Sequence, residues 1–387
     1  MAVYEGFGQR TWRDPWSLYR ALRDADPVHR SPLGLWVLTR FGDVFEAARN
    51  TELFSSAQGL TFSNEREALG LEPSIVMMDP PDHTRYRRLV TKGFTPRQVA
   101  EIEPLVRRFV VDRIDELASA GAGDFVAGLA RPLPSYVVAH YLGVPEEDRG
   151  RFEGWTAALV QASATGYSSP GRALAELYGY FSELIERRRA EPGADVVSTL
   201  IAADQDGRGV GLEGMLGYAF VMIAGGNDTA TGLLGGAAEL LTAWRDQRRL
   251  LIEDPSLIPG AVEECLRLTS PVQGLCRVAT EETVIEGTPI AAGDRVMLCY
   301  GAANRDTREF GEDAEIMDVT RPIERLLAFS SGAHHCLGAA VARLQGRVVL
   351  EELLARLPDF AVDAEGGVFA DGAFTRRYET LPFHPTG

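Results

Sequence analysis

The residues with the clearest chemistry lie in one stretch towards the C-terminus, residues 329–338, FSSGAHHCLG. Cys336 sits in a glycine-punctuated loop, and an apolar, alanine-rich helical pattern follows it. A cysteine at the start of a helix meets the positive end of the helix dipole, which favours the thiolate, the form that ligates a metal. Gly332 and Gly338 let the backbone approach a large flat ligand closely, and Phe329 can shield the sulfur from water. The alternative is a buried free cysteine in a turn, as most cysteines are.

The histidines beside this cysteine raise the separate possibility of a zinc site. His334, His335 and Cys336 are consecutive, and three consecutive residues rarely converge on one tetrahedral ion. No second pair of ligands lies at a suitable distance in the sequence. We therefore favour a single thiolate ligand over a zinc cluster.

A long apolar pattern at Leu212–Leu241 predicts a buried helix, and the segment GGNDT interrupts it. Gly225 and Gly226 each destabilise a helix interior by roughly 1 kcal/mol relative to alanine, so a local reason is expected. Missing side chains leave space for a diatomic ligand and allow the backbone ladder to open. Asp228 and Thr229 add a carboxylate and a hydroxyl, which together can form a proton path. The alternative interpretation is that the two glycines only allow close packing against a neighbouring element, and that the polar residues after them lead out to solvent.

Two further pairs are spaced to share one helical face. Glu264 and Arg267, at i and i+3, precede Pro271 on an apolar helix and can form an ion pair, although surface pairs of this kind contribute only about 0–1 kcal/mol. His83 and Arg87, at i and i+4, would present two donors suited to carboxylates. The neighbouring arginines of that segment are also compatible with a solvated helical face.

Taken together, these motifs resemble those of the cytochrome P-450 family. The spacing F-x-x-G-x-H-x-C-x-G resembles its haem-binding loop, and E-x-x-R, G-G-x-D-T and H-x-x-x-R resemble three other family signatures. The resemblance runs from about residue 10 to the end. One departure is Ala230, which stands where a second hydroxyl residue often follows the threonine; Thr231 comes one position later.

The resemblance implies a mainly α fold with minor β structure, with a long central helix over the haem and small antiparallel sheets. It also implies haem b (iron protoporphyrin IX) as the cofactor and Cys336 as the axial iron ligand. Asp228 and Thr229, beside Gly225 and Gly226, are implied to serve oxygen activation. The residues implied to hold the haem propionates are His83, Arg87, Arg277 and His334. Arg321 is implied to join Glu264 and Arg267 in a network beneath the haem.

The substrate pocket implied by the resemblance is largely apolar. It would draw on the loop at 55–76, on the central helix, on the segment after Pro271 and on the tail. Gln273 is one possible polar contact in this set. We expect the substrate to be a terpenoid, steroid, fatty acid or secondary metabolite. The residues predicted to line the pocket are Phe62, Val221, Ala224, Val272, Gln273, Leu275 and Phe374.

The implied activity is that of a monooxygenase that inserts one oxygen atom of O2 into a lipophilic small molecule. A proximal thiolate donates electron density to iron and favours O–O cleavage. No segment resembles a flavin or iron–sulfur module, so electrons from NAD(P)H would arrive indirectly through a ferredoxin and its reductase. The alternatives are a peroxygenase that uses hydrogen peroxide and a catalytically silent haem-binding scaffold or sensor.

Composition and length narrow the function further. The 387 residues carry 39 basic and 55 acidic side chains, a net charge of −16, which argues against nucleic acid or an anionic membrane as partner. Four cysteines without a CxxC pair suggest a reduced cytosol. No signal peptide or run of 18 apolar residues is found. We expect a cytoplasmic monomer without a membrane anchor, and one domain over residues 1–387, since no linker divides the chain.

Periodicity and turn residues predict the positions of most elements. Irregular chain is expected at 55–78 and 305–326, and a tail with strand character at 359–383. Helices are predicted at 15–22, 43–49, 81–92, 97–119, 133–142, 146–162, 170–190, 195–203, 212–241, 255–270 and 337–357, and strands at 28–30, 35–38, 275–279, 283–285, 290–292 and 295–299.

Overall fold

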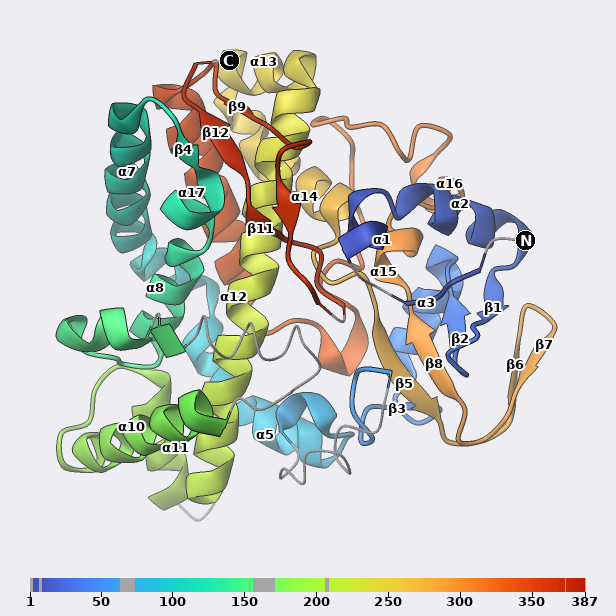
Figure 1. Cartoon of the computed structure of the whole chain (residues 1–387). Coiled ribbons are helices and arrows are strands. Elements are labelled where there is room, and N and C mark those ends of the chain that lie inside the picture. The colour runs from blue at the N-terminus through green and yellow to red at the C-terminus, as the bar shows by residue number, and fades with distance from the viewer. Residues whose placement is uncertain are drawn as a thin grey trace.

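The computed structural model describes residues 3–6, 9–62, 74–152, 154–155, 171–205, 209–372 and 374–386. These residues form a mainly helical structure with four small sheets, which confirms the predicted fold class (Figure 1). No helix within the described ranges is both long enough and apolar enough to span a membrane.

The helices follow the predicted periodicity, with two informative differences. The stretch 97–119 divides into α6 and α7 at Ile102, because Pro104 in the first turn of α7 has no amide hydrogen to continue the ladder of α6. Of the predicted helix at 146–162, residues 146–152 and 154–155 are described, beginning with a 3-10 turn at Glu146–Asp148, and the remainder lies outside the described residues. The α-helices are α1 Gln9–Arg13, α2 Trp16–Ala25, α3 Phe41–Arg49, α5 Asp82–Val90, α6 Pro96–Glu101, α7 Glu103–Ala120, α8 Pro132–Tyr141, α10 Gly171–Ala190, α11 Val196–Gln205, α12 Gly211–Ala243, α13 Arg245–Glu253, α14 Ile258–Thr269, α15 Tyr300–Ala303, α16 Thr307–Phe310 and α17 Ala339–Arg356. The short turns of 3-10 or π helix are η1 Ile75–Met77, η2 Thr91–Phe94, η3 Val126–Ala130, η4 Glu146–Asp148, η5 Pro255–Leu257 and η6 Gly332–His334.

The strands are short, and the prediction at 290–292 is wrong by two residues. Glu286 and Gly287 both have positive φ and form a two-residue hairpin turn, which pairs Ile285 with Thr288 and places the second strand earlier. The two-residue strands β3 and β4 were not predicted, since they are too short for a periodic signal. The strands are β1 Val28–Arg30, β2 Trp36–Leu38, β3 Phe54–Ser55, β4 Gly123–Asp124, β5 Leu275–Ala279, β6 Thr283–Ile285, β7 Thr288–Ile290, β8 Arg295–Leu298, β9 Ala361–Val362, β10 Val368–Phe369, β11 Tyr378–Thr380 and β12 Pro382–His384.

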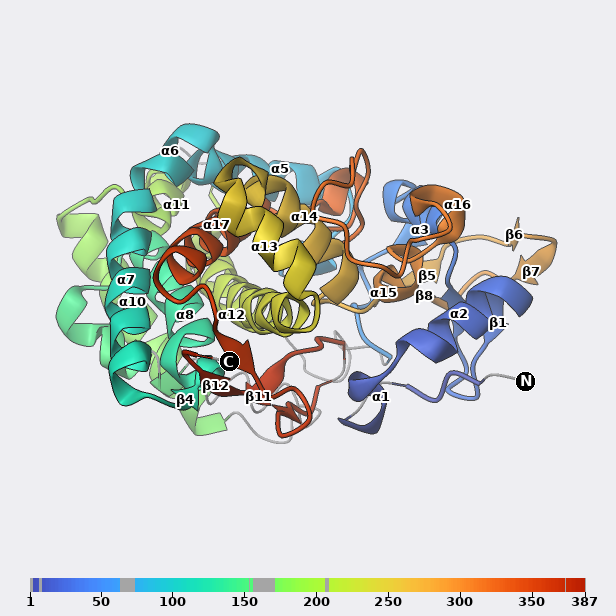
Figure 2. The ribbon, with the colours of Figure 1, turned by 90° about the horizontal axis from the view of Figure 1, so that it is seen from above.

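The helix α12 is the centre of the arrangement. Seen nearly end-on, it has α7, α8 and α10 on one side and the strands of the largest sheet on the other (Figure 2). That sheet has the order β1-β2-β8-β5-β3, in which only β2 and β8 run parallel. The α12 helix packs against α8 and α14, and its apolar residues join the largest core cluster.

Burial along α12 is uneven, so the prediction of a helix buried nearly all round holds only for its second half. Residues 230–238 are all buried, whereas Leu212 is 44% exposed. Small residues allow the close packing of the second half: a Cβ on Gly232 would lie 2.7 Å from the Arg376 carbonyl oxygen, and one on Gly236 would lie 2.4 Å from Thr269 Cγ2. The first half therefore remains open on the side where the candidate site lies.

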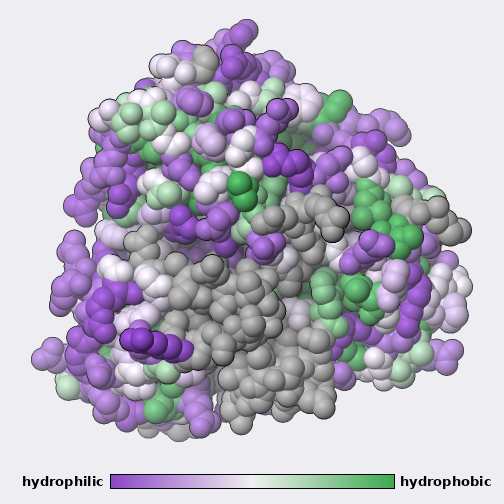
Figure 3. Space-filling model, in the orientation of Figure 1, coloured by the Kyte–Doolittle hydropathy of each residue, from purple (hydrophilic) through white to green (hydrophobic). Residues whose placement is uncertain are grey.

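Among the described residues on the face shown in Figure 3, hydrophilic side chains predominate, with smaller hydrophobic patches between them. The large apolar residues that are exposed are scattered over separate elements, which is ordinary for a globular protein. They are Val3, Leu33, Leu212, Leu250, Ile252, Val284, Ile316 and Val368.

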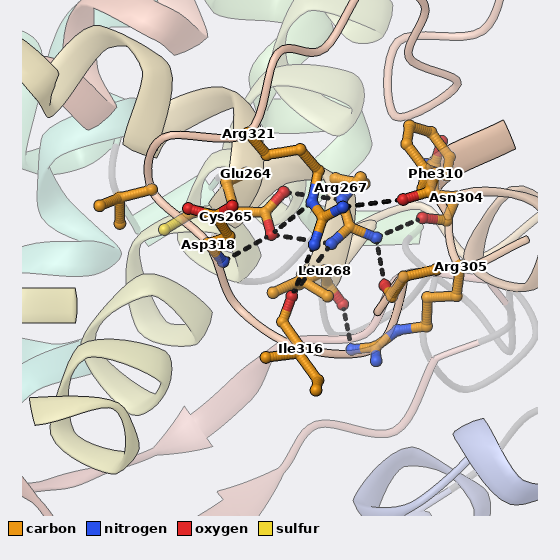
Figure 4. A network of polar contacts seen from close by, with 12 residues as sticks. Glu264, Cys265, Arg267, Leu268, Asn304, Arg305, Phe310, Ile316, Asp318 and Arg321 are labelled. Atoms are coloured by element: carbon orange, nitrogen blue, oxygen red, sulfur yellow. Dashed lines mark hydrogen bonds and ion pairs between the residues drawn. The ribbon is translucent and has the colours of Figure 1, made fainter. Parts of the chain in front are cut away.

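A buried ion-pair network fixes the irregular segment after α15 to the end of α14 (Figure 4). Arg267 makes a two-pronged contact with Glu264, with both N···O distances 2.7 Å, and both side chains are almost completely buried. The Arg321 guanidinium lies 3.4 Å from Glu264, and the backbone amide of Asp318 donates to the same carboxylate. Arg267 also donates to the carbonyl oxygen of Asn304. The three residues predicted to form this network therefore lie together.

We predict that Glu264→Ala lowers the free energy of unfolding by about 3–5 kcal/mol, because it leaves Arg267 buried without its counter-charge. The adjacent Glu263 provides a matched control: it pairs with Arg343 at 2.6 Å but is partly exposed, so Glu263→Ala should cost about 0–1 kcal/mol. Urea denaturation of the two variants measures both values. Equal losses would contradict a structural role for the network.

Candidate functional site

The cysteine loop is a closed turn held by its own backbone. The Cys336 amide donates to the Phe329 carbonyl at 2.9 Å, and the His335 amide donates to Gly332. Gly332 has a φ of +70°, and a Cβ there would lie 2.8 Å from the Cα of Arg49, so glycine is required on two grounds. The loop is thereby fixed against α3 and presents its sulfur at a defined position.

Cys336 lies three residues before the first residue of α17, so its sulfur enters from the loop, as the sequence predicted. The side chain is exposed, in contrast to Cys265, Cys276 and Cys299, which are buried. Burial of the surrounding loop raises the pKa of the Cys336 thiol, whereas the Gly338 amide and the guanidiniums of Arg87 and Arg343 act to lower it. A metal cation bound to the sulfur would add to the groups that lower this pKa and would favour the thiolate over the thiol.

Phe329 and Gly338 flank the sulfur from opposite ends of the loop. Phe329 is buried, and the Arg343 guanidinium lies 4.6 Å from the centre of its ring. A Cβ on Gly338 would lie 4.0 Å from the Cys336 sulfur, in ordinary contact, so this glycine is not sterically required here. Its contribution is the amide that faces the sulfur.

Four basic side chains gather beside the loop, although they come from three distant segments. The His83 ring, from α5, lies 4.2 Å from the His334 ring, centre to centre. Arg87 donates to the carbonyl oxygens of Ala333 and His335, at 3.1 and 2.5 Å, and so ties α5 to the cysteine loop. The fourth group, Arg277 in β5, is buried and donates to the backbone of its neighbour Cys276. We name this group the basic cluster: His83, Arg87, Arg277 and His334.

The electrostatics of the basic cluster indicate that it favours a negatively charged ligand. The pKa of His334 falls to about 3, first because of burial and then because of the positive charges of Arg277, His83 and Arg87. Burial and Arg87 likewise lower the pKa of His83. The neighbouring carboxylate of Asp79 accepts from Ser55 and Ser56, at 2.5 and 2.9 Å.

The residues present fit a haem. One accessible thiol and a cluster of four basic groups match the two things that haem offers a protein, an iron to ligate and two propionates to neutralise. An orphaned donor supports this match: among the described residues, His83 Nδ1 is buried and has no hydrogen-bond partner. No group of three or more His, Cys, Asp or Glu side chains in the described part of the chain is placed to hold a metal ion.

The two adjacent glycines in the middle of α12, Gly225 and Gly226, serve different purposes. A Cβ on Gly226 would lie 3.0 Å from Val138, so this glycine permits close packing on α8, whereas a Cβ on Gly225 would meet nothing within 4 Å. Gly225 is exposed, which leaves open surface in the middle of a long helix. The backbone remains helical through this segment, so the expected opening of the ladder does not appear as a break.

Alternate side chains of α12 donate hydrogen bonds to the carbonyl oxygen four residues earlier. Thr229 Oγ1 donates to Gly225 at 2.7 Å, Asn227 Nδ2 donates to Ile223 at 2.7 Å, and Thr231 Oγ1 donates to Asn227 at 2.9 Å. Back-bonding of this kind competes with the helix ladder and weakens it locally. The Thr229 hydroxyl is therefore held close to the exposed glycine, where an incoming molecule can reach it.

Asp228 has a partner that sequence reasoning missed. Its Oδ1 lies 2.7 Å from Nε of Arg377, which immediately precedes β11. Burial raises the pKa of Asp228 to about 6, and Arg377 opposes that shift. The only sequence signal was the pair of adjacent arginines, Arg376 and Arg377, in a tail whose other charged residues are acidic. Nothing in the spacing links them to a residue about 150 positions earlier.

The predicted pocket residues fall into two groups, and one prediction is wrong. Gln273 is completely buried, and its amide is used internally: it accepts from the Tyr19 hydroxyl and donates to the carbonyl oxygens of Thr269 and Ser270. It holds the end of α14 and is not a polar contact for a ligand. The remaining residues of the set are partly buried: Phe62, Val221, Ala224, Val272, Leu275 and Phe374.

Sequence reasoning also did not find a cavity of about 510 Å³ between η1, α5 and the first half of α12. Its apolar wall includes Met77, Met78 and Tyr218. Acidic and basic side chains contribute to the rest of its lining: Asp79, Asp82, Arg85 and Glu213. This cavity lies along the open half of α12 and extends to the part of the 55–76 loop that the structure describes.

Comparison with known proteins identifies the family. The cytochrome P450 family model matches residues 239–363. The chain is 54% identical to Cytochrome P450 130 of Mycobacterium tuberculosis, over 97% of this chain and 96% of that protein. It is 36% identical to the Vitamin D(3) 25-hydroxylase of Pseudonocardia autotrophica, over 97% of this chain and 95% of the relative.

Solved structures agree with this result. The fold matches that of the Bacillus subtilis cytochrome P450 PksS with a TM-score of 0.90 and 30% identity, covering 98% of this chain and 99% of that one. It matches CYP109Q5 from Chondromyces apiculatus with a TM-score of 0.88 and 34% identity, covering 97% and 96%. The chain therefore belongs to the cytochrome P450 family, is a P450 monooxygenase, and has haem iron as its cofactor.

We predict that Gly332→Ala destabilises the protein more than Gly34→Ala does. Both glycines have positive φ, which costs alanine roughly 1–2 kcal/mol. Only Gly332 also faces backbone atoms, at 2.8 and 3.1 Å, whereas a Cβ on Gly34 would meet nothing within 4 Å. The free energies of unfolding in urea give the comparison. Indistinguishable losses would show that contact between the loop and α3 is not what requires this glycine.

Proposed function

We propose that this chain holds haem b through Cys336 and the basic cluster, and oxidises a lipophilic small molecule with electrons from a ferredoxin. The observation that carries the proposal is the convergence of an accessible thiol with four basic side chains from α5, β5 and the cysteine loop. Haem iron ligated by a thiolate supplies the activation of dioxygen and the transfer of one oxygen atom. The protein supplies binding, orientation and protons.

In this proposal the basic cluster neutralises the propionates. Arg87 and Arg277 offer guanidinium donors to the propionates, and His83 has a buried Nδ1 without a partner that can donate to a carboxylate. Charge-assisted hydrogen bonds contribute about 1.5–3 kcal/mol each. Because Arg87 also binds the carbonyl oxygens of the cysteine loop, its position links the propionates to the thiolate loop.

Arg87→Ala should lose haem faster to a haem-acceptor protein, by roughly tenfold or more if one such bond is lost. Arg88→Ala is the matched control, since Arg88 is the next residue on the same helix and is exposed. The rate of haem transfer, followed by absorbance, measures the effect. Equal rates of haem transfer for both variants would show that Arg87 does not bind a haem propionate.

Thr229 and Asp228 are assigned to proton delivery. The Thr229 hydroxyl is held at the exposed surface of α12 by its bond to Gly225 and can donate to a molecule bound there. With a pKa of about 6, Asp228 can exchange protons near neutral pH, as a proton-transfer group requires. The two side chains have separate partners, Arg377 for Asp228 and the Gly225 carbonyl for Thr229, so a proton passes between them only when the Asp228 contact is released.

We predict that Thr229→Ala, supplied with NADH through a ferredoxin and its reductase, still consumes NADH but releases a larger fraction of the consumed oxygen as hydrogen peroxide. The reason is that a missing hydroxyl slows the proton supply that leads to product. Thr229→Ser keeps the hydroxyl and should restore coupling, which separates loss of the donor from a packing defect. Peroxide per NADH, measured with a peroxidase assay, is the readout. An unchanged ratio in Thr229→Ala would contradict the assignment.

A lipophilic, ring-containing substrate is the class that the comparisons favour. One relative, at 37% identity over 96% of this chain, is a Steroid C26-monooxygenase, and CYP109E1 from Bacillus megaterium, which this fold matches with a TM-score of 0.86, has been solved in complex with testosterone. The partly buried apolar residues along α12 suit such a molecule. Binding-induced spectral shifts with a small steroid and terpenoid library would rank candidates within this class.

The ferredoxin would dock on the face beneath Cys336. The protein is strongly acidic overall, so a local positive surface is needed for a small acidic electron carrier. Arg343 is paired with Glu263 and Arg97 with Glu101, which reduces their contribution, whereas Arg88 is exposed. We extend the proposal to a cytoplasmic monomer with one domain over the whole chain.

Turnover with different electron sources tests the proposed function against its alternatives. With NADH, a surrogate ferredoxin and its reductase, the protein should convert a bound steroid-class ligand to product containing one atom from labelled O2. Product formed only with hydrogen peroxide would indicate a peroxygenase. Spectral binding of ligands without product from either source would indicate a silent scaffold or sensor. Omitting the ferredoxin is the control for electron supply.

A further inference from the structure

A line of alternating charges connects Asp228 on α12 to the molecular surface. Arg377 Nε lies 2.7 Å from Asp228, and its Nη1 lies 2.7 Å from Glu379. Arg131, at the end of η3, follows at 3.0 Å on the other oxygen of Glu379. The side-chain exposures are 18%, 5%, 44% and 37% along this line, so it begins in the interior and ends in solvent.

The arrangement directs Asp228 away from its neighbour in sequence. The Asp228 carboxylate is engaged by Arg377, while the Thr229 hydroxyl is engaged by the Gly225 carbonyl. A carboxylate in a short contact with a guanidinium is held ionised and fixed in direction. Release of that contact is therefore needed before the carboxyl can carry a proton towards Thr229.

Because Arg377 binds two carboxylates through different nitrogens, its hold on Asp228 is shared with Glu379. Glu379 is partly exposed, and Arg131 balances its charge from the other side. If Glu379 loses its charge, Asp228 is the only carboxylate that the Arg377 guanidinium pairs with in this line. If Arg131 is removed, Glu379 has no other cation in the line and competes more strongly with Asp228 for Arg377. The surface end of the line thereby controls the buried end.

We propose that Arg377 is a positioning residue which controls when Asp228 accepts and donates a proton, and that Glu379 and Arg131 adjust its hold from the surface. This inference rests on the proposed function of Asp228 in proton delivery. In each cycle the carboxylate takes a proton from solvent as Arg377 turns to Glu379. It then gives that proton to the hydroxyl oxygen of Thr229, which passes its own proton on.

The charged groups that face Asp228 act in opposite directions on its pKa. Burial raises it to about 6, Arg377 lowers it, Glu379 raises it and Arg131 lowers it. The line of charges therefore makes signed predictions. Arg377→Met should move the protonation midpoint of Asp228 up by about one pH unit or more, Glu379→Gln should move it down, and Arg377→Lys should return it towards the parent value.

The experiment is a carbon-13 NMR titration of the full-length, haem-loaded protein in its reduced, carbon-monoxide-bound form, which is diamagnetic. The protein is labelled at the aspartate carboxyl carbons, and the Asp228 signal is the one missing from Asp228→Asn. Arg356→Met is the matched control, since it removes one positive charge from a surface pair with Asp115 at 2.9 Å. The peroxide fraction is measured over the same pH range in each variant.

Opposite shifts in Arg377→Met and Glu379→Gln, with none in Arg356→Met, would support the proposal, because a general loss of structure moves both variants alike. A midpoint that stays at the parent value in Arg377→Met would overturn it. If Arg377→Met does not fold, an unmoved midpoint in Glu379→Gln overturns it equally. If the midpoints shift but the peroxide profile does not change, Arg377 does control the protonation of Asp228. In that case Asp228 does not deliver protons, and the proposed function of this residue is refuted.

Discussion

The placement of positive charge beside one sulfur is the constraint on which the rest of the structure depends. The protein carries a net charge of −16, yet α5, β5 and the cysteine loop bring four basic side chains together next to Cys336. Burial first, and the mutual repulsion of these positive charges second, disfavour the charged form of His334, whose pKa falls to about 3. An anionic ligand converts that repulsion into attraction, so binding free energy becomes part of the stability of the folded protein.

The surrounding structure holds Cys336 and the basic cluster in place and leaves one side of the site accessible. The Glu264–Arg267–Arg321 network fixes the segment that precedes the cysteine loop, and the Gly332 turn seats the loop against α3. The second half of α12 is buried and packs in the core, whereas its first half is partly exposed beside the candidate site. One half therefore stabilises the fold and the other can be reached by a ligand, and Asp228 lies near the boundary between them.

Motifs that act through local spacing were predictable from the sequence, and contacts between distant segments were not. The pairs Glu264–Arg267 and His83–Arg87 follow from helical geometry. Gly332 was expected to let the backbone approach a flat ligand, whereas the structure requires glycine there for a positive φ and for the contact with Arg49. The partner of Asp228 could not be predicted, because helical spacing says nothing about a strand that returns about 150 residues later. Gln273 was misjudged for the same reason: the hydroxyl that occupies it comes from Tyr19, at the other end of the chain.

Ligation of iron by Cys336 is the central claim, and the absorbance spectrum of the reduced, carbon-monoxide-bound protein tests it most directly. The account predicts the red-shifted band of thiolate ligation in the parent and in Cys265→Ala, whose cysteine is buried in the core. Cys336→Ser should lose this band even when haem is retained. Persistence of the band in Cys336→Ser would contradict the account, because the thiolate would then come from another residue.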